Sequence, residues 1–247
     1  MKASELLQAV RDDIDEASAA FWSDALLLRY INRAYKWSRN KIISFDEGFF
    51  EREVTVTYPA STRQTKLRDI DAGEFDNDPH RIILVEDISG GSNSPVALDR
   101  IAKVDEGHYR LKGETFTDSQ TVQNPGYYVT SMSGPRADDG SIPDTSMAIG
   151  MRPVLSGSRT LRITYIPGVS DLVYSTDPAK DHTPDIPPAF NEVIVLRAVV
   201  LAKKREEAPV QDYEIELQRC LQDAINAIDG KGRQRVRITD PSAYHYP

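Results

Sequence analysis

The chain has 247 residues, of which 40% are hydrophobic and 28% charged, a composition typical of a soluble folded protein and not of a disordered or collagen-like one. This length suits one large domain or two small ones. The formal charge of −8 is uneven, because residues 230–247 carry +3 and residues 1–229 carry −11. An acidic body repels nucleic acid at a distance, whereas a basic tail attracts an acidic partner.

Several protein classes are excluded by short features of the sequence. The longest apolar run, VIVLRAVVLA at 193–202, has ten residues, and a membrane span needs about 20, so we expect a buried helix and no membrane segment. The N-terminal MKASELLQAV has no apolar core or small-residue cleavage site, so no secretory signal is predicted. Cys220 is the only cysteine, which excludes a disulfide within the chain and favours folding in a reducing compartment.

Two helices are predicted in the first 48 residues. In residues 4–17 apolar side chains recur three or four positions apart, which is the period of a helix. Ser23 is a good N-cap for a second helix, because its hydroxyl can accept from an unpaired N–H group of the first turn, and Asp24 suits the positive end of the helix dipole. The apolar stripe of this second helix consists of Leu27, Tyr30, Ile31, Ala34, Ser38 and Ile42.

The middle of the chain changes to the period of a strand. EREVTVTYP (51–59) and RTLRITYIP (159–167) alternate apolar and polar residues, as half-buried strands do. Further strands are predicted at RIILVEDI (81–88), YYVTSM (127–132) and SMAIGMRP (146–153). No helices alternate regularly with these strands, so an antiparallel sheet or small barrel is favoured over a βαβ fold. LDRIAKVDEG (98–107) fits a short helix or a loop, and the sequence leaves both open.

The helical period returns after DIPPAF (185–190). Pro187 and Pro188 favour a helix start, since a proline is tolerated in the first turn. From Phe190 to about Glu207 the helix is apolar almost all round as far as Leu201, which predicts burial on more than one side.

A last helix follows Pro209, which ends or interrupts the preceding one. Its apolar stripe runs from Val210 to Ile228, and Gly230 is predicted as its C-cap. The remaining tail, which contains an alternating RVRIT segment, is predicted to be extended.

Together these elements predict an α+β fold. Residues 1–48 and 185–230 form a helical bundle platform, residues 49–184 an inserted antiparallel β-rich subdomain, and residues 231–247 an extended basic C-terminal arm. Helices from both ends of the chain can close one bundle and hold the insert between them.

The sequence has no recognisable catalytic or metal-binding motif. It lacks the glycine-rich phosphate loops and the nucleophile elbow, and Cys220 has no neighbouring cysteine or histidine. The acidic cluster DAGEFDND (71–78) does not have the spacing of an EF-hand loop, so a solvated loop is favoured over a metal site. No metal-ligand spacing is present among His80, His108, His182 and His245. We therefore predict a protein that is not an enzyme and has no cofactor or metal ion.

The basic arm is the single candidate for nucleic-acid binding. Its RQRVR segment, with Tyr244 and Tyr246, could follow phosphates and stack on bases. Its charge is small and the rest of the chain is acidic, so a protein partner is favoured over DNA.

FWSDALLLRYINRAYKW (21–37) resembles the opening helix of head–tail adaptor (connector) proteins of tailed bacteriophages. These often have Trp-Ser/Pro-Asp, two leucines and a Leu/Ile-Asn pair. The matching residues here are Trp22, Ser23, Asp24, Leu27, Leu28, Ile31 and Asn32. Further segments resemble the same family: PGYYV, GMRP, LRITYIPGVSDL and IPPAFNEVIVLRAVVLAKK. The resemblance covers most of the chain.

The resemblance implies a structural virion protein, assembled in the host cytoplasm, that forms a twelve-fold ring at the head–tail junction. Such a ring binds beneath the portal protein, joins it to a tail or nozzle protein, and lets genomic DNA pass through its channel without sequence-specific binding. An acidic channel would fit this role, because phosphates find no counter-charge on it. A head-to-tail contact must close into a ring or grow into a filament, and a portal template would select closure.

Two sets of residues are expected to make contacts in such a ring. The arm would dock on the portal or a neighbouring adaptor through Arg233, Arg235, Arg237, Tyr244, His245 and Tyr246. The subunit interface would consist of Arg29, Arg33, Lys36, Arg39, Phe190, Ile194, Arg197 and Leu201.

Two other functions remain as alternatives. One is a virion or surface β-domain that binds glycan through its central strands, which exposed aromatic residues on one sheet face would favour. The other is a metal-dependent DNA-processing enzyme, which metal-dependent DNA cleavage would reveal.

Overall fold

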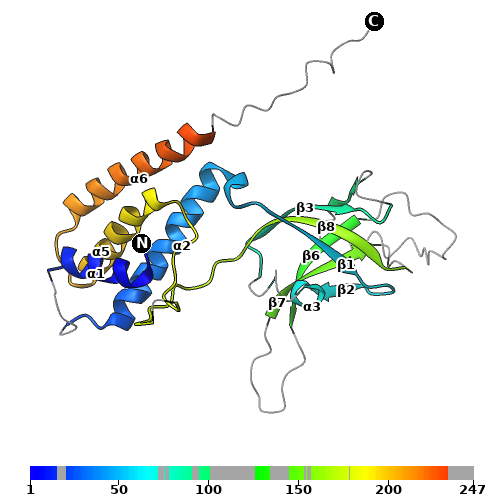
Figure 1. The fold of residues 1–247 in the computed structure, drawn as a ribbon, viewed down its shortest axis with the longest axis horizontal. Helices are drawn as coiled ribbons and strands as arrows, with labels where there is room; N and C mark the ends of the chain where they lie inside the picture. Colours follow the sequence, from blue (N-terminus) through cyan, green and yellow to red (C-terminus); the bar gives the residue numbers. More distant parts are fainter. Residues whose placement is uncertain are drawn as a thin grey trace, which may run out of the picture. The chain divides into compact units, whose positions relative to one another are not determined.

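The computed structural model describes residues 1–15, 21–71, 75, 78–90, 95–100, 126–133, 145–152, 154, 157–177 and 179–232. They form two compact units (Figure 1). The helical unit combines Met1–Phe49 with the chain from Asp171 onward, and the β unit is Phe50–Ser170. The α+β fold class is confirmed. Residues 171–184, expected in the β insert, lie in the helical unit, because their hydrogen bonds go to its helices, as described below.

The helical unit is built from helices at both ends of the chain. They are α1 (Ala3–Asp13), α2 (Asp24–Phe45), the 3₁₀ turns η1 (Glu47–Phe50, at the boundary between the units) and η2 (Pro188–Phe190), α5 (Asn191–Arg205) and α6 (Gln211–Gly232). The predicted N-cap of α2 is confirmed, since the Ser23 hydroxyl accepts a hydrogen bond from the Leu26 N–H group at 3.3 Å. The predicted C-cap at Gly230 is wrong, because α6 continues to Gly232. One glycine costs a helix only about 1 kcal/mol, too little to end one that already has an apolar stripe.

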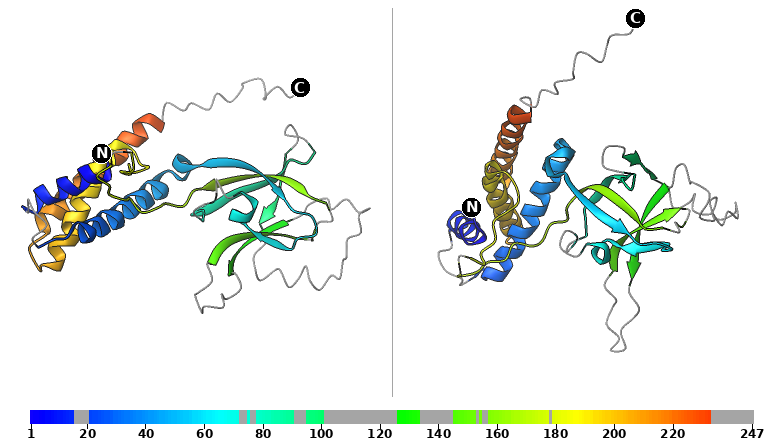
Figure 2. Two further views of the ribbon diagram at one scale, coloured as in Figure 1. Left: turned by 60° about the horizontal axis from the view of Figure 1, so that its bottom comes forward. Right: turned by 45° about the vertical axis from the view of Figure 1, so that its right-hand side comes forward.

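Helix α5 forms the centre of the helical unit. It packs against α1, α2 and α6, and it lies between α2 and α6 (Figures 1 and 2). The predicted burial on more than one side is therefore confirmed. The buried residues of α5 are Val193, Ile194, Val195, Leu196, Ala198, Val199, Val200 and Ala202.

The β unit contains every strand that the sequence predicts. The long strands are β1 (Arg52–Tyr58), β3 (Arg81–Asp87), β6 (Gly126–Ser133), β7 (Thr145–Arg152) and β8 (Arg159–Ile166). Shorter elements were not predicted: β2 (Gln64–Lys66), α3 (Leu67–Ile70), β4 (Val96–Ala97) and β5 (Asp99–Arg100). Of the segment 98–107, residues 99–100 form β5, and residues 101–107 lie outside the described part of the chain.

The strands form two four-stranded sheets, in the orders β1-β8-β3-β4 and β2-β7-β6-β5. Neighbouring strands are antiparallel except β5 and β6, which pair in parallel over two residues. Residues of both sheets meet in one core, where the rings of Phe75 and Tyr165 lie 5.0 Å apart. Burial raises the pKa of the Tyr58 phenol to about 12, and its hydroxyl donates to the Thr62 carbonyl.

A close contact between β6 and β7 constrains the second sheet. Tyr128 and Gly150 are opposite each other in the antiparallel register. The Tyr128 ring lies where a Cβ atom on Gly150 would be, so no larger residue fits there without movement of the ring. The Tyr128 hydroxyl donates to the Arg63 carbonyl at 3.3 Å, which links this ring to the chain just before β2.

Candidate interaction surface

The segment 171–187, which we call the strap, runs along the helical unit, and its described residues (171–177 and 179–187) form no regular secondary structure. Asn32 in the middle of α2 anchors its first part. The Asn32 side-chain amide donates to the Leu172 carbonyl at 3.1 Å, and its oxygen accepts from the Leu172 N–H group at 2.6 Å. Asn32 thus holds a backbone 140 positions away in the sequence.

The far part of the strap is held by α1 and α2 together. The Ala3 N–H group donates to the His182 carbonyl at 2.8 Å, and the Ser4 hydroxyl donates to the Asp181 carboxylate at 2.5 Å. The Tyr35 hydroxyl accepts from the Asp185 N–H group at 3.1 Å. Burial raises the pKa of the Tyr35 phenol, so it stays neutral at physiological pH. These hydrogen bonds hold the strap in place along α1 and α2.

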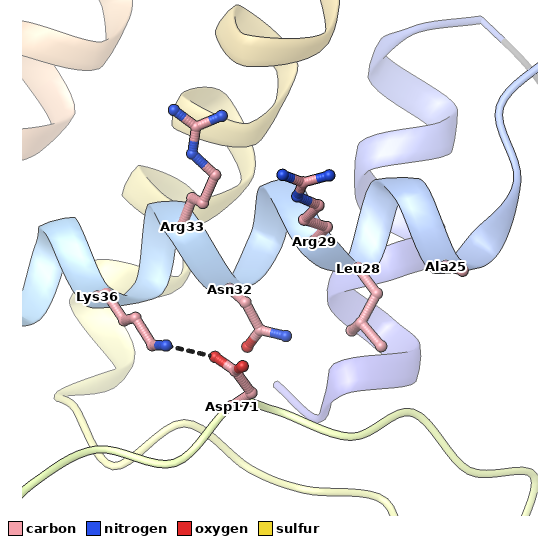
Figure 3. A pocket seen from close by; sticks show the side chains of 7 residues that line it. All are labelled: Ala25, Leu28, Arg29, Asn32, Arg33, Lys36 and Asp171. Atoms are coloured by element: carbon pink, nitrogen blue, oxygen red, sulfur yellow. Dashed lines mark ion pairs between the residues drawn. The ribbon is translucent and has the colours of Figure 1, made fainter. Parts of the chain in front are cut away.

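One face of α2 beside the strap is open and basic. Arg29, Arg33 and Lys36 are exposed, as the sequence predicted, and they line a hollow of about 290 Å³ together with Ala25, Leu28, Asn32 and Asp171 (Figure 3). Lys36 forms an ion pair with Asp171 at 2.7 Å. Arg29 and Arg33 point away from Asp171, and neither forms an ion pair with another described residue (Figure 3). This face can bind an anionic group.

Arg39, expected on the same open face, is buried, with 2% of its surface exposed. It lies one turn after the buried Tyr35, at the border of the apolar stripe, where packing within the helical unit covers it. Its side chain is therefore not available to a neighbouring subunit.

The four interface residues expected in α5 and in the turn before it are likewise either buried or partly exposed. Phe190 and Ile194 have no exposed surface, so the chain itself covers them. Arg197 is partly exposed and lies over the ring of Trp37, with 5.0 Å from the guanidinium carbon to the ring centre. Leu201 is partly exposed. The burial of α5 is thus explained by α1, α2 and α6, without a neighbouring subunit.

The expected arm contacts lie outside the described residues. These are Arg233, Arg235, Arg237, Tyr244, His245 and Tyr246.

The described residues contain no cluster of three or more His, Cys, Asp or Glu side chains that could hold a metal ion. In the acidic segment 71–78, the Asp78 carboxylate instead accepts from the Met147 N–H group at 2.9 Å. Burial, and then the nearby carboxylates of Glu192, Glu216 and Asp223, raise the pKa of the Cys220 thiol. The thiol is therefore protonated at neutral pH and is not an activated nucleophile.

Two further observations bear on the alternatives. In the described strands the aromatic side chains, Tyr58, Tyr127, Tyr128 and Tyr165, are all buried, so the exposed aromatic face that would favour glycan binding is not formed by them. Among the described residues, no helix is both long and apolar enough to cross a membrane.

Sequence reasoning missed the strap and the role of Asn32. One signal was available: asparagine is a poor residue for the interior of a helix, because its side chain competes for backbone hydrogen bonds, so its presence there indicates a specific partner. The sequence of the strap itself shows no hydrophobic period that would predict where it lies.

Comparison with known proteins gives one finding. The model of the family described as SU10 adaptor protein matches residues 1–241. The search of curated proteins found no match.

Proposed function

The chain belongs to the SU10 adaptor protein family, whose name denotes a structural phage component, and we propose that it forms the ring that joins the portal to the tail. In this proposal about twelve copies assemble head to tail beneath the portal protein at the head–tail junction, and a tail or nozzle protein binds the other side. The protein performs no reaction.

The extent of the family match carries this proposal. Residues 1–241 include both helical ends and the β unit, so the likeness concerns the whole arrangement and not one shared module. The basic face of α2 supports it further, since Arg29 and Arg33 have no ion-pair partner among the described residues and a neighbouring acidic subunit would supply one.

The channel of the ring is proposed to carry genomic DNA without binding it. The charge of −11 on residues 1–229 supports this, because a surface without excess cations gives phosphates no strong attachment. Sequence-specific recognition has no role in such a passage.

Solution mass measured with and without the purified portal protein tests the proposal. We expect a ring, or monomers that become a ring when the portal is added. A chain that stays monomeric and has no affinity for portals would contradict the adaptor function.

The arm is proposed to dock on the portal or on a neighbouring adaptor, with Arg233, Arg235 and Arg237 pairing with acidic residues. Deletion of residues 233–247, which leaves α6 complete, should abolish stable attachment to portals. The matched control replaces the arm by an uncharged Gly/Ser segment of equal length, and it should fail in the same way. If the deleted chain assembles on portals and joins tails normally, the arm has no such role.

A further inference from the structure

The outer face of α6 has the opposite charge to the open face of α2. Asp212, Glu216 and Asp223 are exposed on it, against one exposed cation, Arg219. Neither Asp212 nor Glu216 forms an ion pair with another described residue. At 100° per residue these four side chains and Ile215 lie within one stripe of the helix. Ile215 is a large apolar residue that is 70% exposed, whereas Leu217, Leu221, Ala224 and Ile228 of the same helix are buried.

The two faces also match in the spacing of their charged pairs, and each has one apolar residue beside its pair. Arg29 and Arg33 are four positions apart on α2, as Asp212 and Glu216 are on α6, and such pairs stand about 6 Å apart on a helix. Leu28 precedes the basic pair and lines the hollow, while Ile215 lies between the acidic pair. Two carboxylates at this spacing can face the two guanidinium groups, and Ile215 is the exposed apolar residue beside them that the hollow at Leu28 can take.

We infer that the open face of α2 binds the outer face of α6 of a second copy of this chain. Asp212 and Glu216 of the second copy pair with Arg29 and Arg33, and Ile215 enters the hollow beside Leu28. This inference deepens the proposed function, on which it rests, because it assigns the surfaces that join neighbours in the ring.

The contact must form between copies and not within one chain. In the helical unit α5 lies between α2 and α6 (Figure 1), and α6 packs against α5. The buried residues of α6, Leu217, Leu221, Ala224 and Ile228, lie on the opposite side of that helix from Asp212 and Glu216. The outer face of α6 and the open face of α2 are therefore directed away from each other. Because the two faces are different surfaces, the contact is heterologous and repeats from copy to copy, as a closed ring requires.

Two charge-reversed variants test the inference. One carries Arg29→Glu with Arg33→Glu, and the other carries Asp212→Lys with Glu216→Lys. In each variant alone the facing surfaces have the same charge. The affinity of self-association should therefore fall by about 100-fold or more, and fewer copies should bind to each purified portal assembly. Analytical ultracentrifugation and native mass spectrometry measure both quantities.

An equimolar mixture of the two variants is the decisive arm of the experiment. Each acidic α2 face then meets a basic α6 face, and each basic α2 face meets an acidic α6 face. We expect the mixture to assemble to within about tenfold of the wild-type affinity, with the two variants alternating. If mixing restores assembly, the open face of α2 must contact the outer face of α6 in a neighbouring copy.

Two controls separate the contact from general effects of charge or folding. Glu51→Lys with Asp69→Lys makes the same change of charge as the α6 variant, at exposed positions of the β unit, and it should assemble as the wild type does. Unchanged circular dichroism of each variant verifies that the helices are intact. As a second measurement, Leu28→Cys and Ile215→Cys, placed in separate Cys220→Ser chains, should cross-link to each other with a short bifunctional reagent on portal assemblies.

The inference is overturned if either variant alone assembles like the wild type, if the mixture stays dissociated, or if the cysteine pair does not cross-link on fully occupied portals. Loss of binding to duplex DNA in Arg29→Glu/Arg33→Glu, with ring assembly intact, would instead assign the face to nucleic acid. Loss of portal attachment with self-association intact would assign it to the portal. In these cases the adaptor function stands, whereas it fails if the wild type neither self-associates nor binds portals.

Discussion

The helical unit and the β unit differ in how completely each covers its own side chains. The β unit is one continuous segment, and Tyr58, Tyr127 and Tyr165 of its described strands lie in a shared core. The helical unit comes from both ends of the chain, and it leaves Arg29 and Arg33 on one face and Ile215 on another without partners among the described residues. Because Arg29, Arg33 and Ile215 belong to the helical unit, we propose that this unit carries the partner-binding surfaces.

The two units should also unfold separately, and tryptophan fluorescence can distinguish them. Both tryptophans of the chain, Trp22 and Trp37, lie in the helical unit. Their emission therefore reports on that unit, while circular dichroism reports on both. The following predictions use this separation.

The largest effect is expected at the centre of the helical unit. Ile194→Asp places a charge in a site with no exposed surface, at a cost of about 5 kcal/mol or more, and should abolish the fluorescence-detected folding of this unit. The strand signal should remain. Asn191→Asp is the control, because it introduces the same charge in the first turn of α5, where the helix dipole favours it. Loss of both signals in Ile194→Asp would show that the units depend on each other.

A smaller effect is expected in the β unit. Gly150→Ala should destabilise it by about 1–3 kcal/mol, because the new Cβ atom and the Tyr128 ring cannot occupy the same space. Urea unfolding followed by circular dichroism measures the loss, and the tryptophan transition should not move. Gly157→Ala is the matched control, since a Cβ atom there meets no heavy atom within 4 Å. Equal stability of the two variants would contradict the packing described for Tyr128.

The strap should respond to a single side chain of α2. Asn32→Ala removes two hydrogen bonds to Leu172 and leaves a backbone donor and acceptor without partners, at a cost of about 1–3 kcal/mol. We expect faster limited proteolysis within 171–187 and a lower fluorescence-detected midpoint. Asn40→Ala, at an exposed position of the same helix, should change neither. Unchanged cleavage in Asn32→Ala would mean that the other strap contacts suffice.

The smallest effect concerns Cys220. Its pKa is raised, chiefly by burial and then by nearby carboxylates, so the thiolate fraction at pH 7–8 is lower than for a free thiol. Alkylation by iodoacetamide should be slower than in the urea-unfolded chain, and the rate should rise with pH up to the raised pKa. A rate in the folded chain equal to that in urea would contradict this environment.

Hydrophobic period and helix capping predicted the helices and strands whose signal lies within their own residues. The stripe of α2, the near-continuous apolar run of α5 and the alternation in β1 and β8 each contain their own signal, and Ser23 marks a helix start by chemistry within one turn. Strands of two or three residues, such as β4, have no period to detect, and only their partner strands define them.

The long-range contacts could not be predicted in the same way. Asn32 meets Leu172 across 140 positions of the chain, so no local pattern indicates that the second part of the helical unit begins at Asp171 and not at 185. The basic residues of α2 were predicted on one face, and three of them are exposed. Arg39 is not, because packing at the border of the stripe, and not residue type, decides its burial.

We propose that this chain forms a ring between portal and tail. Electron cryo-microscopy of the virion, with the chain identified by a fused marker domain, tests it most directly. We expect a ring of copies at the head–tail junction, each with its α2 face against α6 of the next copy. A chain absent from the junction, or present there as a single copy, would contradict it.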